Sequence, residues 1–427
     1  MMLLPKFLYT IQNYPSSLPA SWFRTTNALL QSFIWGNKPP RVSFAKCCQS
    51  TYDGGLAMID LQLYYWASQL VVINDWMCGG WSDPTYRREL QPLGLEGTLG
   101  MMYGAPIPSN TLEGTRAVVV AWRGALRRTG WERKLTAMTP LWVGSWLKQT
   151  AGLEGFGAWD KIGISLLGDI MGNDEIMAFS ELREEFGLHH TQLYRYLQLR
   201  HALTQYKQRL VDLPDHNPLE AKLLNGAIGK GGISKIYKTL IINSPECFSA
   251  LRSRWEEMTG DLEEEEWREA RLAPRELAIS SRLRLIQFKY LHLIYRTPGF
   301  LNKIYPTGNV GCPRCSEPGA GFLHMTWTCG IIQIFWGKIR RILSQVLGRD
   351  IDLSPKVALL GITFEVGGPR GDRKLVGLAT LIAKRDIAQN WRASQAPPIK
   401  KWRAGMDWVS KIEEQVYIAR GCPGKHA

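Results

Sequence analysis

The chain has 427 residues, of which 45% are hydrophobic and 11% aromatic, so it is long enough for two or three globular domains and too apolar to be disordered. Its formal net charge of +14 favours a polyanionic partner, most simply nucleic acid. Its N-terminus does not resemble a secretory signal, and because it has no apolar run of about 18 residues we expect no transmembrane helix. Its cysteines show no disulfide-framework spacing, so we expect a reducing compartment, the cytoplasm and nucleus.

Hydrophobic periodicity predicts a mainly α fold, multi-helical and irregular. Apolar residues repeat at helical spacing over Pro19–Trp35, and Pro19 suits a first helical turn. The segment Arg41–Lys46 is expected to be a short extended piece. Asp60 is a good N-cap for a second helix, which reaches about Met77 and is apolar on most faces. We therefore expect this second helix to be buried.

Several short motifs follow one another in this first part: Leu4–Tyr9, Pro19, Trp35 with Arg41, Gly54-Gly55, and Tyr64-Tyr65-x-Ala67. Their order resembles the region just downstream of the reverse transcriptase domain in polyproteins of LINE-type, non-LTR retrotransposons. That family tends to carry a proline before the aspartate that follows the glycine pair, whereas this chain has Met58-Ile59-Asp60. The resemblance implies a segment cut from a longer polyprotein.

Aromatic and cationic residues interleave over His189–Leu210, which is predicted to be a helix. Such residues could stack on bases and neutralise phosphates, so Arg195, Arg200 and Lys207 are candidate nucleic-acid contacts. The alternative is an ordinary amphipathic helix whose tyrosines belong to the core. The sequence does not decide between the two interpretations.

A further basic helix is predicted over Ile279–Arg296, where Thr297-Pro298 ends it. Arg282, Lys289 and Arg296 recur every seven residues, so they are expected to share one face and to contact phosphates. The acidic run Glu263–Glu266 precedes this helix. Four consecutive carboxylates point in different directions around a helix, so we interpret them as a solvated helix start rather than a catalytic pair.

The sequence then has the pattern C-x2-C-x8-H-x4-C, formed by Cys312, Cys315, His324 and Cys329. Two thiols separated by two residues can hold one metal ion from a single turn, and the other two side chains complete a tetrahedral set of the kind that structural zinc requires. The central gap is longer than in the short retroviral-type knuckle. The sequence therefore predicts a small zinc-knuckle-like module, with chance spacing of reduced cysteines as the alternative.

Three more helices are predicted after the module, over Ile331–Leu347, Lys374–Trp391 and Trp402–Ala419. Lys338 and Arg341 on the first of them, and Arg314 between the paired cysteines, are further candidate phosphate contacts. A basic helix, then Tyr295-x-Thr-Pro298, then the Cys/His pattern, then Phe335-Trp336 is an order that resembles the carboxy-terminal segment of LINE-type polyproteins. In that comparison the four ligands match Cys312, Cys315, His324 and Cys329.

The sequence predicts three segments: a helical connector at 1–150, a basic-aromatic region at 151–300, and the zinc-knuckle-like segment at 301–427. A polymerase site needs carboxylates that hold two metal ions, and the chain has no adjacent Asp-Asp pair and no convincing endonuclease set, so we expect no enzymatic activity. The preferred hypothesis is a fragment that binds RNA and DNA with little sequence preference. The alternatives are an appendage that packs on a reverse transcriptase domain, a remnant with no activity of its own, and an enzyme whose cleft the sequence does not reveal.

Overall fold

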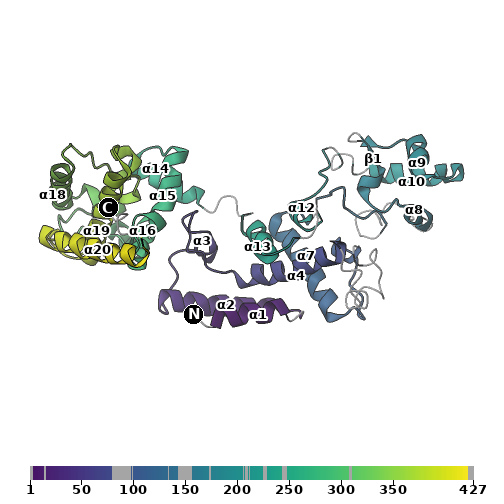
Figure 1. Ribbon diagram of the computed structural model, residues 1–427, viewed down its shortest axis with the longest axis horizontal. Coiled ribbons are helices and arrows are strands. Elements are labelled where there is room, and N and C mark those ends of the chain that lie inside the picture. The colour runs from purple at the N-terminus through teal and green to yellow at the C-terminus, as the bar shows by residue number, and fades with distance from the viewer. Residues whose placement is uncertain are drawn as a thin grey trace. The chain divides into compact units, whose positions relative to one another are not determined.

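The computed structural model describes residues 3–13, 16–78, 98, 100–132, 134–142, 156–172, 175–204, 206, 210, 212–224, 228–242, 248–306 and 310–421. Helices make up most of the described chain (Figure 1). The one sheet among these residues is the antiparallel pair β1 (Met171–Gly172) and β2 (Glu175–Ile176), in which Met171 lies opposite Ile176. The predicted mainly α, multi-helical class is confirmed.

Contacts divide the chain into two compact units. Unit 1 comprises residues 1–34 and 59–245, and unit 2 comprises residues 35–58 and 246–427. The segment boundary predicted at 150/151 lies outside the described residues. The boundary predicted at 300/301 falls inside a helix, α17 (Pro298–Ile304). Among the described residues, no helix combines the length and the apolar character that crossing a bilayer would demand.

Unit 1 contains the first helices and the small sheet. Its helices are α1 (Leu3–Asn13), α2 (Ala20–Trp35), α4 (Leu61–Cys78), α7 (Glu113–Thr129), α8 (Gly157–Lys161), η2 (Leu167–Ile170), α9 (Phe179–Phe186), η3 (His190–Gln192), α10 (Leu193–Thr204), α12 (Glu220–Leu223) and α13 (Gly232–Ile242). Helix α2 ends at the residue that begins unit 2. The predicted helix at Pro19–Trp35 is therefore confirmed almost to the residue.

Helix α4 is the central helix of unit 1, and it is buried as predicted. Its start is capped by Asp60, whose Oδ1 accepts hydrogen bonds from the backbone N–H of Gln62 and Leu63 at 3.0 and 3.1 Å. Leu70 and Ile73 lie in one core cluster with residues of α7 and α13. A second cluster in the same unit gathers around Trp159 from α8 and the buried face of α10.

Unit 2 holds the C-terminal helices and one short helix from the first part of the chain. Its elements are α3 (Phe44–Cys48), α14 (Ser249–Thr259), α15 (Glu264–Glu276), α16 (Ser281–Leu291), α17 (Pro298–Ile304), the π-helix η4 (His324–Thr328), α18 (Gly330–Leu347), the π-helix η5 (Lys356–Leu360), η6 (Phe364–Val366), α19 (Arg370–Gln389) and α20 (Ile399–Ala419). The expectation of an extended piece at Arg41–Lys46 is wrong, because α3 begins within it.

Helix α19 lies at the centre of unit 2. Its residues 376–383 are buried without interruption, and they join a large apolar cluster that includes Trp255, Tyr290 and Trp336. The acidic run before α16 is a helix start, as predicted: Glu263 is the N-cap of α15, and its backbone N–H donates to the carboxylate of Glu266 at 2.7 Å. The same core contains Cys312 and Cys329, so two of the predicted metal ligands are part of the packed interior.

Candidate metal centre

Cys312 and Cys315 lie on one tight turn. The backbone N–H of Ser316 donates to the carbonyl of Cys312 at 2.8 Å, and the N–H of Cys312 donates to the carbonyl of Glu317 at 2.8 Å. Ser316 has a positive φ of 64°, which reverses the chain directly after the second thiol. The turn thus presents both sulfur atoms on one side, with Cys312 buried and Cys315 exposed.

His324 and Cys329 are placed by a wide helical turn. His324 is the first residue of the π-helix η4 and Cys329 directly follows its last, and the backbone N–H of Cys329 donates to the carbonyl of His324 at 3.1 Å. A π-turn closes over five residues rather than four, and such turns are frequent at functional sites. Cys329 is also the N-cap residue of α18, so the same backbone that presents the last thiol begins a long helix.

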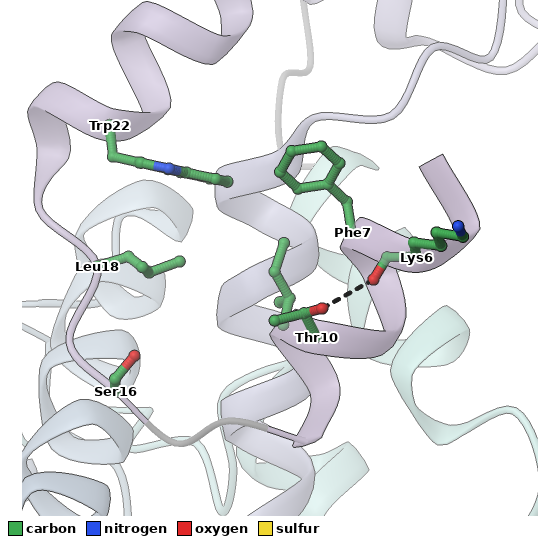
Figure 2. A pocket seen from close by; sticks show the side chains of 7 residues that line it. Lys6, Phe7, Thr10, Ser16, Leu18 and Trp22 are labelled. Carbon is green, nitrogen blue, oxygen red and sulfur yellow. Dashed lines mark hydrogen bonds between the residues drawn. The ribbon is translucent and has the colours of Figure 1, made fainter. Parts of the chain in front are cut away.

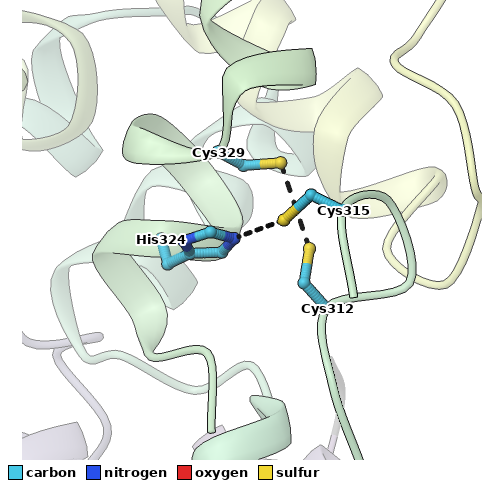
Figure 3. Close-up of side chains that lie close together, drawn as sticks. All are labelled: Cys312, Cys315, His324 and Cys329. Carbon is cyan, nitrogen blue, oxygen red and sulfur yellow. Dashed lines mark hydrogen bonds between the residues drawn. The ribbon is translucent and has the colours of Figure 1, made fainter. Parts of the chain in front are cut away.

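The four side chains converge (Figure 3), and their ligand atoms all lie within 4.8 Å of one another. The Sγ atoms of Cys312 and Cys329 are 4.0 Å apart, and the Sγ of Cys315 is 3.2 Å from the Nε2 of His324. Two thiolates bound tetrahedrally to one ion at zinc–sulfur distances would be about 3.8 Å apart. The predicted Cys/Cys/His/Cys module is therefore confirmed as a cluster that could hold a metal ion.

Backbone dipoles favour the ionised form of Cys312. Burial raises the pKa of this thiol, but hydrogen bonds from the backbone N–H groups of Cys315 and Arg314 lower it, and the neighbouring cysteine side chains lower it further. The net pKa lies below the usual value for cysteine. A thiolate is the form that binds metal, so by lowering the pKa of Cys312 the turn favours the form of this residue that can act as a ligand.

Arg314 is a buried structural residue of this module rather than a surface cation. It is buried, and its guanidinium donates to the carbonyls of Met325 at 3.3 Å and Asn390 at 2.9 Å. These bonds tie the cysteine turn to η4 and to the end of α19. The prediction of Arg314 as a phosphate contact is wrong, because its guanidinium is buried and donates to backbone carbonyls of its own fold.

The other basic residues predicted near α16 do not share one helix face. Helix α16 ends at Leu291, and Leu293 has a positive φ of 52°, so Arg296 lies beyond a chain reversal. Arg282 and Arg296 are exposed, and Lys289 is half-buried. The expected periodic alignment of the three residues is wrong because the helix is shorter than predicted.

Two predicted cations do lie on the helix that follows the metal ligands. Lys338 and Arg341 of α18 are exposed. Their neighbour Arg340 is instead engaged in an ion pair with Asp350 at 2.8 Å. Helix α18 buries Phe335 and Trp336 on its other side, so its orientation is fixed by the same core that contains Cys329.

In unit 1, the surroundings of α10 are acidic. Arg200 lines a hollow together with Glu181, Glu184 and Glu185 of α9. Arg195 lies 5.5 Å from the ring centre of Phe156, while Lys207 lies outside the described residues. Tyr196 is buried on the same helix, and its hydroxyl donates to the carbonyl of Met177 at 3.0 Å. These contacts favour the alternative interpretation, an amphipathic helix with a core tyrosine.

Sequence reasoning missed an exposed aromatic face beside the metal centre. On α17, Phe300 is 48% exposed, Lys303 is exposed, and Tyr305 directly after the helix is 63% exposed. The backbone N–H of Gly299 donates to the carbonyl of Ala320 at 3.0 Å, which attaches the helix to the metal loop. The signal was present in the run Gly299–Tyr305, which mixes aromatic and basic residues directly before the cysteines.

Four protein donors are the number that a tetrahedral structural zinc site uses. A separate hollow between α1 and α2 is lined by apolar side chains, including Phe7, Leu18 and Trp22, and by Lys6, Thr10 and Ser16 (Figure 2). No protein-family model matches the chain.

Proposed function

We propose that the chain is a non-catalytic segment that binds single-stranded RNA or DNA, derived from the part of a LINE-type polyprotein that follows the reverse transcriptase domain. In this proposal it acts inside the cell, in the cytoplasm and nucleus, where cysteines stay reduced. The observation that carries the proposal is the exposed aromatic and basic face of α17, which is attached to the Cys/His cluster.

Zinc is the ion that this donor set fits best, since three thiolates and one imidazole form a structural zinc set. Cys312, Cys315, His324 and Cys329 would hold it. When bound, the ion supplies a cross-link between the cysteine turn and the first residue of α18. The nucleic-acid surface is then formed by the helices next to the metal loop. Helix α17 precedes this loop, and α18 follows the last ligand.

Stacking and charge are available together in the segment Arg296–Tyr305. Phe300 and Tyr305 offer exposed rings, and Lys303 and Arg296 are exposed cations within ten residues of each other. Proteins that bind single strands without sequence preference combine aromatic stacking with a cationic path for the phosphates. The backbone of Arg296 is fixed, because its carbonyl accepts from the indole N–H of Trp391 at 2.8 Å.

We predict that a fluorescein-labelled single-stranded RNA of mixed sequence binds the chain, with an affinity that falls steeply as salt rises. Each phosphate neutralised contributes about −0.7 to the slope of log K against log salt. Replacing Phe300 and Tyr305 together by alanine should weaken binding about tenfold or more, since each stacked base is worth ~1–3 kcal/mol. Fluorescence anisotropy over a salt series measures both effects.

Tyr194→Ala is the matched control, because Tyr194 is 70% exposed on α10, outside the proposed face. It should leave the affinity unchanged. A folded, soluble chain that does not bind RNA at low salt would defeat the proposal. Equal losses of RNA affinity in Tyr194→Ala and in the double variant would show that α17 is not the binding surface.

A second function is favoured by a specific observation on α2. Leu29 and Phe33 lie one helical turn apart and are 65% and 88% exposed, and Ile34 beside them is 39% exposed. Contiguous apolar residues on a helix face are usually covered by a partner. This favours an appendage that packs on a polymerase domain, a role compatible with RNA binding by unit 2.

The isolated chain should then self-associate through this face. We expect light scattering to give a mass that rises with protein concentration, and the variant Leu29→Glu/Phe33→Glu to stay monomeric. Both positions are exposed, so the substitutions should not disturb the fold. A wild-type chain that remains monomeric throughout the concentration series would contradict the packing function.

A further inference from the structure

Unit 2 contains a cavity that the metal centre does not use. It has a volume of about 570 Å³ and lies at the start of α16, between that helix, the end of α15 and the loop that carries Gly54-Gly55. None of the four Cys/His residues lines it. The volume is within the range of pockets that hold small organic ligands.

The charge of the cavity is positive and uncompensated. Arg275, Arg282 and Arg284 line it, and its lining includes no carboxylate. Within the described part of the chain none of these three arginines forms an ion pair, whereas nearby Arg271 is paired with Asp53 at 3.5 Å. Three guanidinium groups around one hollow favour an anionic ligand, and a phosphate fits their donor geometry.

Two of these guanidinium groups are held in place by neighbours. The Nε of Arg284 donates to the carbonyl of Ala278 at 2.7 Å, which leaves its terminal nitrogens available. The guanidinium of Arg275 lies 3.6 Å from the ring centre of Tyr52. An arginine that is already ordered loses less conformational entropy when it binds an anion.

Most of the rest of the lining is apolar, and Thr51 and Ser281 add hydroxyl groups. Leu56, Leu285 and Phe288 contribute the apolar part of the lining, and Leu285 is 43% exposed. An apolar wall that faces three cations matches a ligand with a planar ring at one end and a phosphate at the other. Inorganic phosphate alone would leave this wall without a contact.

The loop that lines one side of the cavity is held in place by its own hydrogen bonds. A Cβ on Gly55 would lie 2.1 Å from the carbonyl oxygen of Gln49, so only glycine fits there. The carbonyl of Gly54 is 2.9 Å from the Nε2 of buried His292, and the N–H of Leu56 donates to the carbonyl of Cys47 at 3.1 Å. Leu56 is therefore held at the cavity by backbone bonds on both sides.

We infer that this cavity binds one nucleoside phosphate unit, with the phosphate at Arg282 and Arg284 and the base against Leu56 and Leu285. The unit is either a free nucleotide or an unpaired nucleotide of a bound strand. The second case rests on the proposed function, and the first does not. Both require the same arginines and the same apolar wall.

The test uses the full chain and two probes. In equilibrium dialysis, uridine 5′-monophosphate should bind, and uridine should bind at least tenfold more weakly. Arg282→Gln should weaken the binding of uridine 5′-monophosphate about fivefold or more, and Leu285→Glu should abolish it by placing a carboxylate in the cavity. Arg403→Gln is the control, because it removes an equal charge from an exposed position that does not line the cavity.

The second probe is a single-stranded RNA that contains 4-thiouridine. If the unit belongs to a strand, photo-crosslinks should fall in residues 51–56 or 274–288. If RNA binds and crosslinks elsewhere and the mononucleotide does not bind, the cavity is not a nucleotide site. The proposed function would still hold in that case. Binding of the mononucleotide without RNA binding would support a free-nucleotide site and refute the proposed function. Equal effects of Arg282→Gln and Arg403→Gln would reject the cavity in either case.

Discussion

Replacing Cys312 and Cys315 together by serine is expected to abolish zinc binding and to unfold the region around the module. Cys312 is 2% exposed and belongs to the main core of unit 2. Without an ion, the turn that carries it would lose its link to α18. Binding of structural zinc supplies about 10 kcal/mol or more of folding free energy in small modules.

The melting temperature of unit 2 should fall by about 10 °C or more, since ~1 kcal/mol moves the midpoint of a domain of this size by ~2–4 °C. Mass spectrometry under native conditions should find one zinc ion in the wild-type chain and none in the variant. Chelation of the wild-type protein should reproduce the loss of stability. RNA binding should weaken as well, because α17 is attached to the metal loop through Gly299.

Cys48→Ala is the control for the loss of a thiol. Cys48 is buried in unit 2, on α3, and is not part of the metal cluster. It should keep the zinc content unchanged, whatever its own effect on packing. A double-serine variant with unchanged melting and unchanged affinity for RNA would mean that the four side chains converge without holding an ion.

The long helices were predictable because burial of one face decides where they lie. The periodicity that predicts Pro19–Trp35 corresponds to α2, and the predicted helix at Ile331–Leu347 corresponds to α18 (Gly330–Leu347). Asp60 was predictable as a cap because its side chain acts on backbone groups only two and three residues away. Local causes can be recognised in the sequence.

The errors have both long-range and local causes. Arg314 was assigned to the surface by its charge, but the carbonyl that accepts its hydrogen bond belongs to Asn390, 76 residues later. The helix predicted at Ile279–Arg296 ends early, at Leu291, because the chain reverses at Leu293. Short elements such as α3 contain too few residues to show a period. The cavity beside α16 combines segments more than 200 residues apart, so no sequence motif predicts it.

The sequence predicts the four ligands of the candidate metal centre, but not the backbone turn and the packing around them. Spacing alone identified Cys312, Cys315, His324 and Cys329, because each pair is close in sequence. The wide turn of η4 and the burial of Cys329 depend on packing against Trp336, whose indole N–H donates to the carbonyl of Thr326 at 2.9 Å. This packing also sets the direction of α18, and it could not be inferred from spacing.

Lys384 is a completely buried amine whose burial no local pattern in the sequence predicts. It is fully buried in α19, and its Nζ donates to the carbonyl of Leu359 at 3.2 Å. That carbonyl also accepts from the amide of Gln287 at 3.1 Å. Burial lowers the pKa of this amine from 10.5 to about 7.

The unfolding free energy of unit 2 should therefore rise with pH between about 7 and 10.5. In this window Lys384 is protonated in the unfolded chain and neutral in the folded chain. The unfolded state therefore binds more protons, and raising the pH destabilises it relative to the folded state. The slope is about 1.4 kcal/mol per pH unit. Near pH 7 the buried amine costs about 4 kcal/mol relative to its solvated, protonated form.

Lys384→Met should remove this cost, because methionine fills a similar volume without an ionisable group. Urea unfolding at pH 7, 8 and 9 should show the variant more stable than the wild type at pH 7, by up to about 4 kcal/mol, with the advantage shrinking as pH rises. The lost hydrogen bond to Leu359 offsets about 1 kcal/mol of the gain, and Gln287 still satisfies that carbonyl.

Lys411→Met on the exposed side of α20 is the matched control, and its difference from the wild type should not depend on pH. Burial also raises the pKa of the neighbouring Asp386, and the Arg385 guanidinium beside it opposes that rise. A pH-independent difference between Lys384→Met and the wild type would mean that the folded chain keeps the amine protonated. The core around η5 would then have to admit water to solvate that charge.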